Sequence, residues 1–165
     1  MAKFETELPT DILKEFDFVR NNAAHIFGQM TRAGAEVVKQ QIAANATRAF
    51  DGKTASKLNQ KLKITKTYDT PSDGGINTKV AYYGYIPRSD GKMVKIKGGS
   101  YPGVPAPLLA ALREFGAKGS GNMPEPLKRY WTKHPFVRPA FANKGAIEKA
   151  MLKAQKELSG GLLDD

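Results

Sequence analysis

The amino-acid sequence predicts an α+β fold in which a long N-terminal helix and a C-terminal helix pack on a mostly antiparallel sheet. Apolar residues recur at helical spacing over residues 12–42 and again over 147–158, as expected of helices that bury one face. Over residues 61–97 the apolar and polar residues alternate instead, which is typical of strands with one wet face. The length of 165 residues suits one domain, so we expect a single domain over 1–165.

The N-terminal part of the chain is expected to be helical up to about residue 50. Thr10 or Asp11 can cap the first turn, because a short side chain with an oxygen atom accepts a hydrogen bond from the free N–H groups there. We expect a break near Asn21–Asn22, which would leave a short helix followed by a long one. Phe50–Gly52 is expected to end this unit.

The middle of the chain is predicted to hold strands joined by turns, together with two loops. Strands rich in β-branched, aromatic and alternating residues are expected over 61–68, 76–86 and 92–97. Loops are expected over 98–105 and 116–126, because their glycines and prolines interrupt regular structure.

The C-terminal part is predicted to hold two helices with a strand between them. The first helix should begin at Pro105 or Pro107 and end at Gly116, since proline suits the first helical turn and glycine suits the residue after the last. A strand is expected within residues 130–141. The final helix, which has the clearest apolar stripe, should be capped by Asn143.

The charge of the chain is strongly asymmetric. The net charge is +10, and residues 53–97 alone hold ten basic and three acidic residues, a net of +7, whereas the N-terminal stretch is acidic. This pattern indicates a basic face that meets either nucleic acid or an acidic protein surface. A solvated sheet face kept soluble by lysine explains the charge equally well. The candidate contact residues, expected to share one sheet face, are Lys61, Lys63, Lys95 and Lys97.

The composition excludes several kinds of protein chemistry. The chain has no cysteine, which excludes disulfides, thiol catalysis and thiolate metal sites and fits a reducing compartment. We find no apolar run near the ~20 residues needed to cross a bilayer, and the first residues lack the apolar core of a signal peptide. We therefore expect a protein made in the cytoplasm that does not enter a membrane.

The chain shows no constellation typical of catalysis. His25 and His134 are the two histidines, and neither has a metal-ligand or catalytic partner at a recognised spacing. His25 is expected to be a packing or surface residue. The glycines at 98–99 and 119–121 do not match phosphate-binding or dinucleotide-binding loops. We expect no enzyme activity, no cofactor and no metal site, unless residues distant in sequence assemble one.

Two sequence elements carry a resemblance to a known family. Leu112–Gly116 contains E-F-G and precedes a glycine-rich loop, and His134–Phe141 contains P-F-V-R-P-A-F and precedes the final helix. With Arg32–Val38 in the first helix, these elements resemble the head–tail joining and tail-completion proteins of long-tailed bacteriophages. The resemblance follows the chain in order over nearly its whole length. Asp51–Leu58 only approximates the family's turn and small helix, and residues 87–107 look like an insertion.

The resemblance implies a function in virion assembly. A protein of this family forms a homo-oligomeric ring, expected to be a hexamer, in the neck of the virion. The ring joins the head connector to the tail, contacts the connector and tail-tube proteins, and lets DNA pass through its lumen. An alternative in the same class is a tail terminator that caps the tail tube. An alternative in another class is a basic module that binds nucleic acid without sequence specificity.

The P-F-V-R-P-A-F element also has a physical interpretation of its own. Pro135 and Pro139 restrict the backbone and should keep this segment extended until Pro139 is passed. Phe136 and Phe141 are then expected to enter the core and to anchor the final helix against the sheet.

The candidate subunit-interface residues are Glu114, Phe115 and Arg138. Because Arg138 lies in a stiff segment, its guanidinium is expected to form a bidentate pair with a carboxylate, with Glu114 as the candidate partner. The pair could lie within one subunit or across a subunit boundary. Core packing with one internal ion pair is the alternative interpretation of the same residues.

Overall fold

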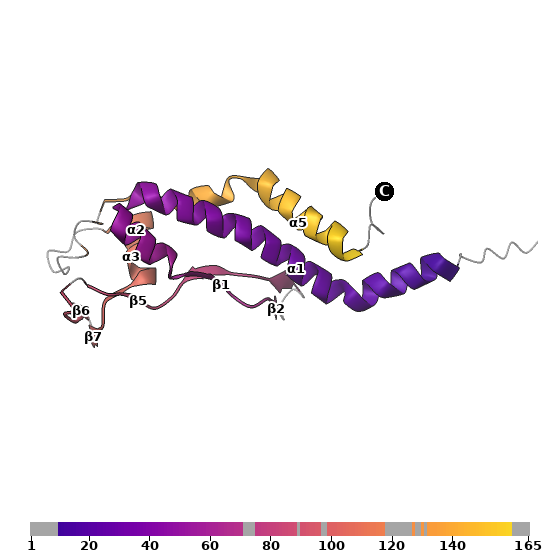
Figure 1. Ribbon diagram of the computed structural model, residues 1–165, viewed down its shortest axis with the longest axis horizontal. Coiled ribbons are helices and arrows are strands. Elements are labelled where there is room, and N and C mark those ends of the chain that lie inside the picture. The colour runs from indigo at the N-terminus through magenta and orange to yellow at the C-terminus, as the bar shows by residue number, and fades with distance from the viewer. Residues whose placement is uncertain are drawn as a thin grey trace, which may run out of the picture.

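The structure is a computed structural model that confirms the α+β class, with a long N-terminal helix, a C-terminal helix and antiparallel strands (Figure 1). It describes residues 10–70, 75–88, 90–96, 99–117, 127, 130 and 132–159. Most of the predicted loop over 116–126 therefore lies outside the described residues, as does Lys97.

Helix α1 runs without interruption from Thr10 to Ala49, a length of about 60 Å at 1.5 Å per residue. The expected break near Asn21–Asn22 is therefore wrong. The Asn22 side chain donates a 2.8 Å hydrogen bond to the carbonyl oxygen of Phe18, so it bonds to its own helix instead of opening it. The N-terminal part of α1 curves away and continues beyond the other labelled elements (Figure 1).

In the part of the chain that the structure describes, the strands form four antiparallel pairs of two strands each. The bounds of the paired strands are β1 Leu62–Ile64 with β4 Val80–Tyr82, β2 Tyr68–Thr70 with β3 Gly75–Asn77, β5 Tyr85–Ile86 with β8 Val104–Pro105, and β6 Val94–Ile96 with β7 Gly99–Tyr101. The antiparallel prediction is confirmed, although the strands are shorter than expected.

The expectation that residues 98–105 form only a loop is wrong, because β7 and β8 lie within them. A glycine explains the second of these pairings. A Cβ atom added at Gly103 would lie 2.3 Å from the carbonyl oxygen of Ile86, so only glycine lets the chain approach β5 this closely.

Two short helices pack near the C-terminal end of α1. Helix α2, Gly52–Asn59, is capped by Asp51, whose carboxylate accepts a 3.0 Å hydrogen bond from the Thr54 N–H. Helix α3, Ala106–Phe115, begins and ends as predicted. Gly116 adopts a φ of 75°, a conformation that favours glycine, and its N–H closes the helix by donating to Leu112.

The C-terminal helix α5, Lys144–Ser159, packs along α1 (Figure 1). The strands lie on the other side of α1 in this view, so α1 forms the middle of the molecule. Gly34 allows the close approach of α5, because a Cβ there would lie 3.1 Å from Met151 Cγ and 3.2 Å from Ile147 Cγ2. The predicted cap is present: the Asn143 side chain accepts a 3.4 Å hydrogen bond from the Ala146 N–H.

The core lies where the C-terminal half of α1 meets α2, α3, the strands and the segment before α5. Phe136 is among the largest fully buried side chains, and the rings of Phe50 and Tyr82 lie 5.3 Å and 6.3 Å from its ring. Its predicted burial is confirmed.

The strand expected within residues 130–141 is absent from the described part of that segment. Residues 132–137 are irregular, and a 3₁₀ helix, η1, covers Arg138–Phe141. The expectation that Phe141 enters the core is also wrong, since this side chain is 54% exposed. The tight turn of η1 places Ala140 in the core instead.

Candidate subunit interface

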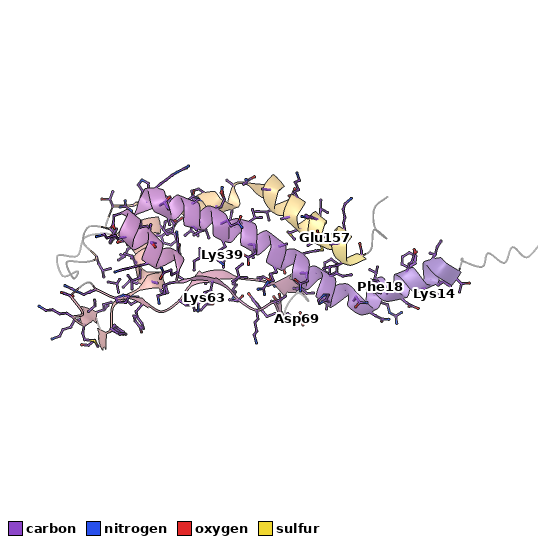
Figure 2. The ribbon with its side chains drawn as sticks, viewed as in Figure 1. Lys14, Phe18, Lys39, Lys63, Asp69 and Glu157 are labelled. Carbon is purple, nitrogen blue, oxygen red and sulfur yellow. The ribbon has the colours of Figure 1, made fainter. Side chains whose placement is uncertain are left out.

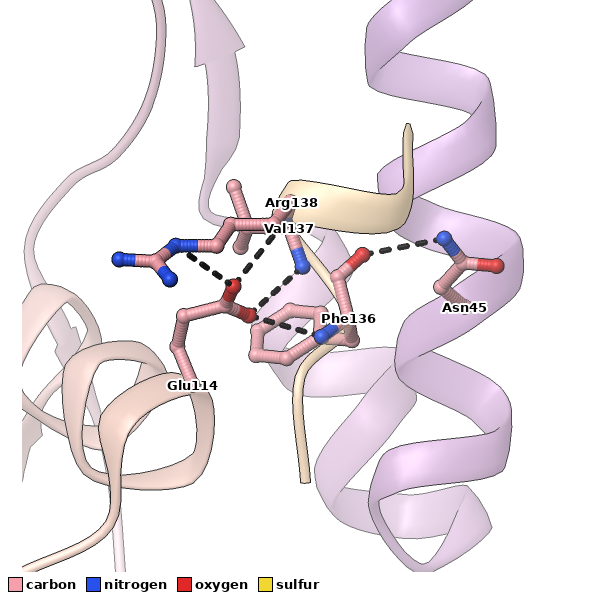
Figure 3. Close-up of polar contacts among 5 residues, drawn as sticks. All are labelled: Asn45, Glu114, Phe136, Val137 and Arg138. Atoms are coloured by element: carbon pink, nitrogen blue, oxygen red, sulfur yellow. Dashed lines mark hydrogen bonds and ion pairs between the residues drawn. The ribbon is translucent and has the colours of Figure 1, made fainter. Parts of the chain in front are cut away.

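The side chain of Glu114 joins the two sequence elements that carry the resemblance (Figure 3). One carboxylate oxygen, Oε2, accepts hydrogen bonds from the backbone N–H groups of Phe136 at 2.7 Å and Val137 at 2.8 Å. The other oxygen, Oε1, accepts a hydrogen bond from the N–H of Arg138 at 3.1 Å. The carboxylate thus binds three consecutive backbone donors.

This arrangement explains why a carboxylate is buried there. Residues 132–137 form no strand, so no ladder satisfies their backbone N–H groups, and buried N–H groups need acceptors. The prolines at 135 and 139 have no N–H, so the backbone donors between them are the N–H groups of Phe136, Val137 and Arg138. Glu114, in the last turn of α3 and only 4% exposed, supplies the acceptors.

The hydrogen bonds also determine the ionisation of Glu114. Burial by itself raises the pKa of a carboxyl group. The hydrogen bonds donated by Val137, Phe136 and Arg138 outweigh this effect, and the pKa of Glu114 lies below its ordinary value. The group is therefore a carboxylate at neutral pH.

Two further side chains hold the same segment, and our sequence analysis did not identify them. Asn45 of α1 donates a 3.0 Å hydrogen bond to the carbonyl oxygen of Phe136 (Figure 3). Arg113 donates to the carbonyl oxygens of Ala49 at 2.6 Å and Thr132 at 3.2 Å. Their polar character within an apolar helical stretch was the available signal, because a polar group at such a position needs a partner.

The predicted contact between Arg138 and Glu114 is present, but its expected bidentate geometry is wrong. The Nε of Arg138 lies 4.0 Å from Glu114 Oε1, at the limit of an ion pair, and the arginine side chain is 71% exposed. The carboxylate oxygens already accept the three backbone hydrogen bonds, so they have little capacity left for a guanidinium. The contact lies within one chain.

The exposed face of this unit is formed by Arg138 and Phe115. The guanidinium of Arg138 lies over the ring of Phe115, with its central carbon 5.1 Å from the ring centroid. Phe115 is 59% exposed, although phenylalanine side chains are mostly buried in folded proteins. We call these two residues the Phe115–Arg138 patch. An aromatic ring and an arginine are the residue types that are most enriched at protein interfaces.

The three candidate lysines that the structure describes, Lys61, Lys63 and Lys95, do not form one sheet face. Lys63 on β1 and Lys95 on β6 are exposed, and Lys61 is half-buried. Strands β1 and β6 belong to different pairs, with Lys63 opposite Ala81 and Lys95 opposite Ser100. The basic side chains are thus distributed along the strands instead of forming a ladder.

The tyrosines of the second predicted strand divide into two groups. Tyr82 is half-buried and packs against Phe136. Tyr83 and Tyr85 are exposed, and the ring of Tyr85 stacks on that of Tyr101 with centroids 5.6 Å apart. Two of the three tyrosines therefore expose their rings.

The histidines lie at the surface, as expected for His25. His25 is exposed and lines an open hollow between α1 and α5, and His134 is exposed and donates its backbone N–H to Arg113. Within the described ranges, no three His, Asp or Glu side chains are grouped in a way that could hold a metal ion. The helices described there include none with the length and hydropathy of a membrane span.

Comparison of the chain with protein-family models, with curated proteins and with solved structures finds no match.

Proposed function

We propose that this chain is a structural protein of the bacteriophage neck that forms a homo-oligomeric ring, with six subunits, between the head connector and the tail. The hydrogen bonds from Phe136, Val137 and Arg138 to Glu114 carry this proposal. They make E-F-G and P-F-V-R-P-A, the two elements of the resemblance, a single structural unit.

The chemistry of the unit supports a role in contacts between subunits. The Glu114 carboxylate fixes the backbone beneath, and the Phe115–Arg138 patch is exposed above it. A rigid base with an exposed aromatic–arginine pair suits an anchor for a neighbouring subunit, because little side-chain or backbone order remains to be created on binding. In the ring, this patch contacts the next subunit.

The basic residues suit a ring that surrounds DNA. Lys63 and Lys95 are exposed on the strands, and the chain carries a net charge of +10. Contacts between lysine and phosphate do not depend on base sequence, so DNA can slide past such a surface during ejection.

Electron microscopy of the purified full-length protein at high concentration tests the proposal. We expect closed rings, and we expect a phage lacking the protein to produce separate heads and tails in its lysate. Complementation with the wild-type gene should restore joined particles. A monodisperse monomer together with normal joining in the absence of the gene would refute the proposal.

A basic module that binds single-stranded or double-stranded nucleic acid is the second candidate. The observation that favours it is the exposure of Tyr83 and Tyr85, which lie in sequence between the exposed Lys79 and Lys95, since aromatic rings stack on bases. Filter binding across a salt series distinguishes the two candidates. Affinity that survives high salt, or that depends on Tyr85, would favour the module, whereas weak, steeply salt-dependent binding fits a ring that merely surrounds DNA.

A further inference from the structure

The N-terminal part of α1, residues 10–24, extends past the end of α5 and carries exposed apolar side chains. We call it the arm. Lys14 and Phe18 lie on it beyond the end of α5, whereas Glu157 marks the last turns of α5 (Figure 2). Ile12, Leu13 and Phe16 are 38%, 46% and 68% exposed. A soluble protein rarely leaves such a stripe in water unless another surface covers it.

The apolar stripe of the arm is the continuation of the α1 face that α5 covers. The apolar positions of α1 alternate in steps of four and three residues, namely Ile12, Phe16, Val19, Ala23, Ile26, Met30, Ala33 and Val37. Ile26 is 4% exposed, and Ala33 lies with Ala154 and Leu158 at the α1–α5 contact. This spacing is the heptad pattern by which one helix packs along another. Ile12 and Phe16 continue it in the exposed part of the arm, and Val19 and Ala23, which are half-buried, connect them to the part that α5 covers.

The charges beside the stripe indicate which helix covers it. If Phe16 and Ala23 occupy heptad position a, Glu15 occupies position g and Arg20 occupies the following position e. In a parallel pair of helices, g of one helix faces this e position of the other. Glu15 of one arm then faces Arg20 of a second arm, with opposite charges.

An antiparallel pair of arms lacks this complementarity. In that orientation the g positions of the two helices face each other, and so do the e positions. Glu15 would then face Asn22, which is also at a g position, and Arg20 would face Leu13, which is also at an e position. Within the described ranges, the one ion pair of Arg20 is an exposed contact with Asp17, at 4.0 Å and with both side chains more than two-thirds exposed. Such a pair is weak and leaves the arginine available for a partner.

The geometry points to the arm of a second copy of this chain as the helix that covers the stripe. The two arms are parallel and in register. Ile12, Phe16, Val19 and Ala23 of the two arms pack together, and Glu15 of each pairs with Arg20 of the other. Rotational symmetry about an axis along the arm makes all arms parallel. In a dimer the contact is reciprocal, whereas in a ring Glu15 of each arm pairs with Arg20 of the next. The inference rests on the self-association in the proposed function and assigns a surface to it.

The first experiment compares two phenylalanines of the same arm. Phe16 lies on the stripe, and Phe18, which is 46% exposed, lies off it. Sedimentation velocity of the full-length chain over a concentration series should show that Phe16→Ser weakens self-association at least tenfold and that Phe18→Ser does not. Circular dichroism should show that both variants keep their helices. Equal effects of the two substitutions would refute the role of the stripe.

The second experiment tests orientation by mixing two charge variants. Glu15→Arg alone and Arg20→Glu alone place like charges together in a parallel pair, so each variant should associate at least tenfold more weakly than the wild type. A mixture of the two restores an opposite-charge pair at both contacts and should associate as the wild type does. A mixture as weak as its components would overturn the parallel arrangement.

The outcomes also separate this inference from the ring itself. If the wild type is oligomeric and the Phe16→Ser variant is equally so, the arm contact is refuted and the ring remains. A wild type that is monomeric at every concentration would overturn both forms of self-association, whereas separate heads and tails in a lysate lacking the gene would still support the neck function.

Discussion

The carboxylate of Glu114 lies 2.7 Å from the backbone nitrogen of Phe136, a residue 22 positions later in the chain. This hydrogen bond and its two neighbours attach the segment before η1 to the last turn of α3. Since Phe136 is itself buried in the core, the same contact orders both the core and the Phe115–Arg138 patch. Changes at Glu114 are therefore expected to act first on folding and only then on assembly.

Replacing Glu114 by alanine should destabilise the chain markedly. The substitution leaves three backbone N–H groups without an acceptor, and we expect the free energy of unfolding to fall by on the order of 3 kcal/mol. Urea denaturation measures this loss. The control is Glu157→Ala on α5, whose side chain is 66% exposed and whose loss should cost within about 0.5 kcal/mol. Equal midpoints for the two variants would contradict the prediction.

The contribution of Glu114 should depend on pH in the acid range. Its pKa is lowered in the folded state, so its stabilising effect is complete above the unfolded value of about 4.3 and is lost as the pH falls through the folded value. The difference in unfolding free energy between the wild type and Glu114→Gln should be constant above about pH 5.5 and should narrow below about pH 4.3. A difference that stays constant down to the acid transition would show that the charge of Glu114 has no role.

Replacing Arg138 by alanine should affect assembly more than folding. Because the guanidinium is 71% exposed and at the limit of an ion pair with Glu114, its loss should cost about 0–1 kcal/mol of stability. We expect the melting temperature to change little and rings or joined particles to become rare. The combination of normal melting and normal ring formation would remove Arg138 from the interface.

Replacing Gly103 by alanine should destabilise the β5–β8 pair. The added methyl group would meet the Ile86 carbonyl oxygen at 2.3 Å, and relief of that clash should cost about 1–3 kcal/mol. Gly52→Ala is the matched control, since a Cβ at Gly52 meets no atom within 4 Å. Thermal denaturation of the two variants should show a loss only for Gly103→Ala.

Replacing Tyr82 by phenylalanine should leave stability unchanged or raise it. The Tyr82 hydroxyl is buried and has no hydrogen-bond partner among the described residues, and its burial raises the pKa of the phenol. Removing the hydroxyl removes the desolvation cost of an unpaired polar group, worth about 1–3 kcal/mol. A loss of stability on denaturation would show that the hydroxyl has a partner, such as a bound water.

Local features of the sequence were sufficient to predict most of the helical structure. The ends of α3 follow from Pro107 and Gly116, and the start of α5 follows from Asn143, because caps and breakers act over a few residues. The continuity of α1 at Asn22 was not predicted, since a break was expected there. Whether an asparagine opens a helix or bonds back to it depends on the geometry of the folded helix.

The sequence alone determined the α+β class and most of the helix ends, and it singled out Glu114 and Arg138 as candidate site residues, since these follow from periodicity, turn chemistry and motif. Only the tertiary structure decided the partners. The carboxylate of Glu114 binds mainly the backbone of residues 136–138 and is only at the limit of an ion pair with the Arg138 guanidinium, because an irregular buried segment leaves N–H groups that need an acceptor. No local sequence pattern predicts that these N–H groups require an acceptor, since the requirement arises only when α3 and that segment are packed together.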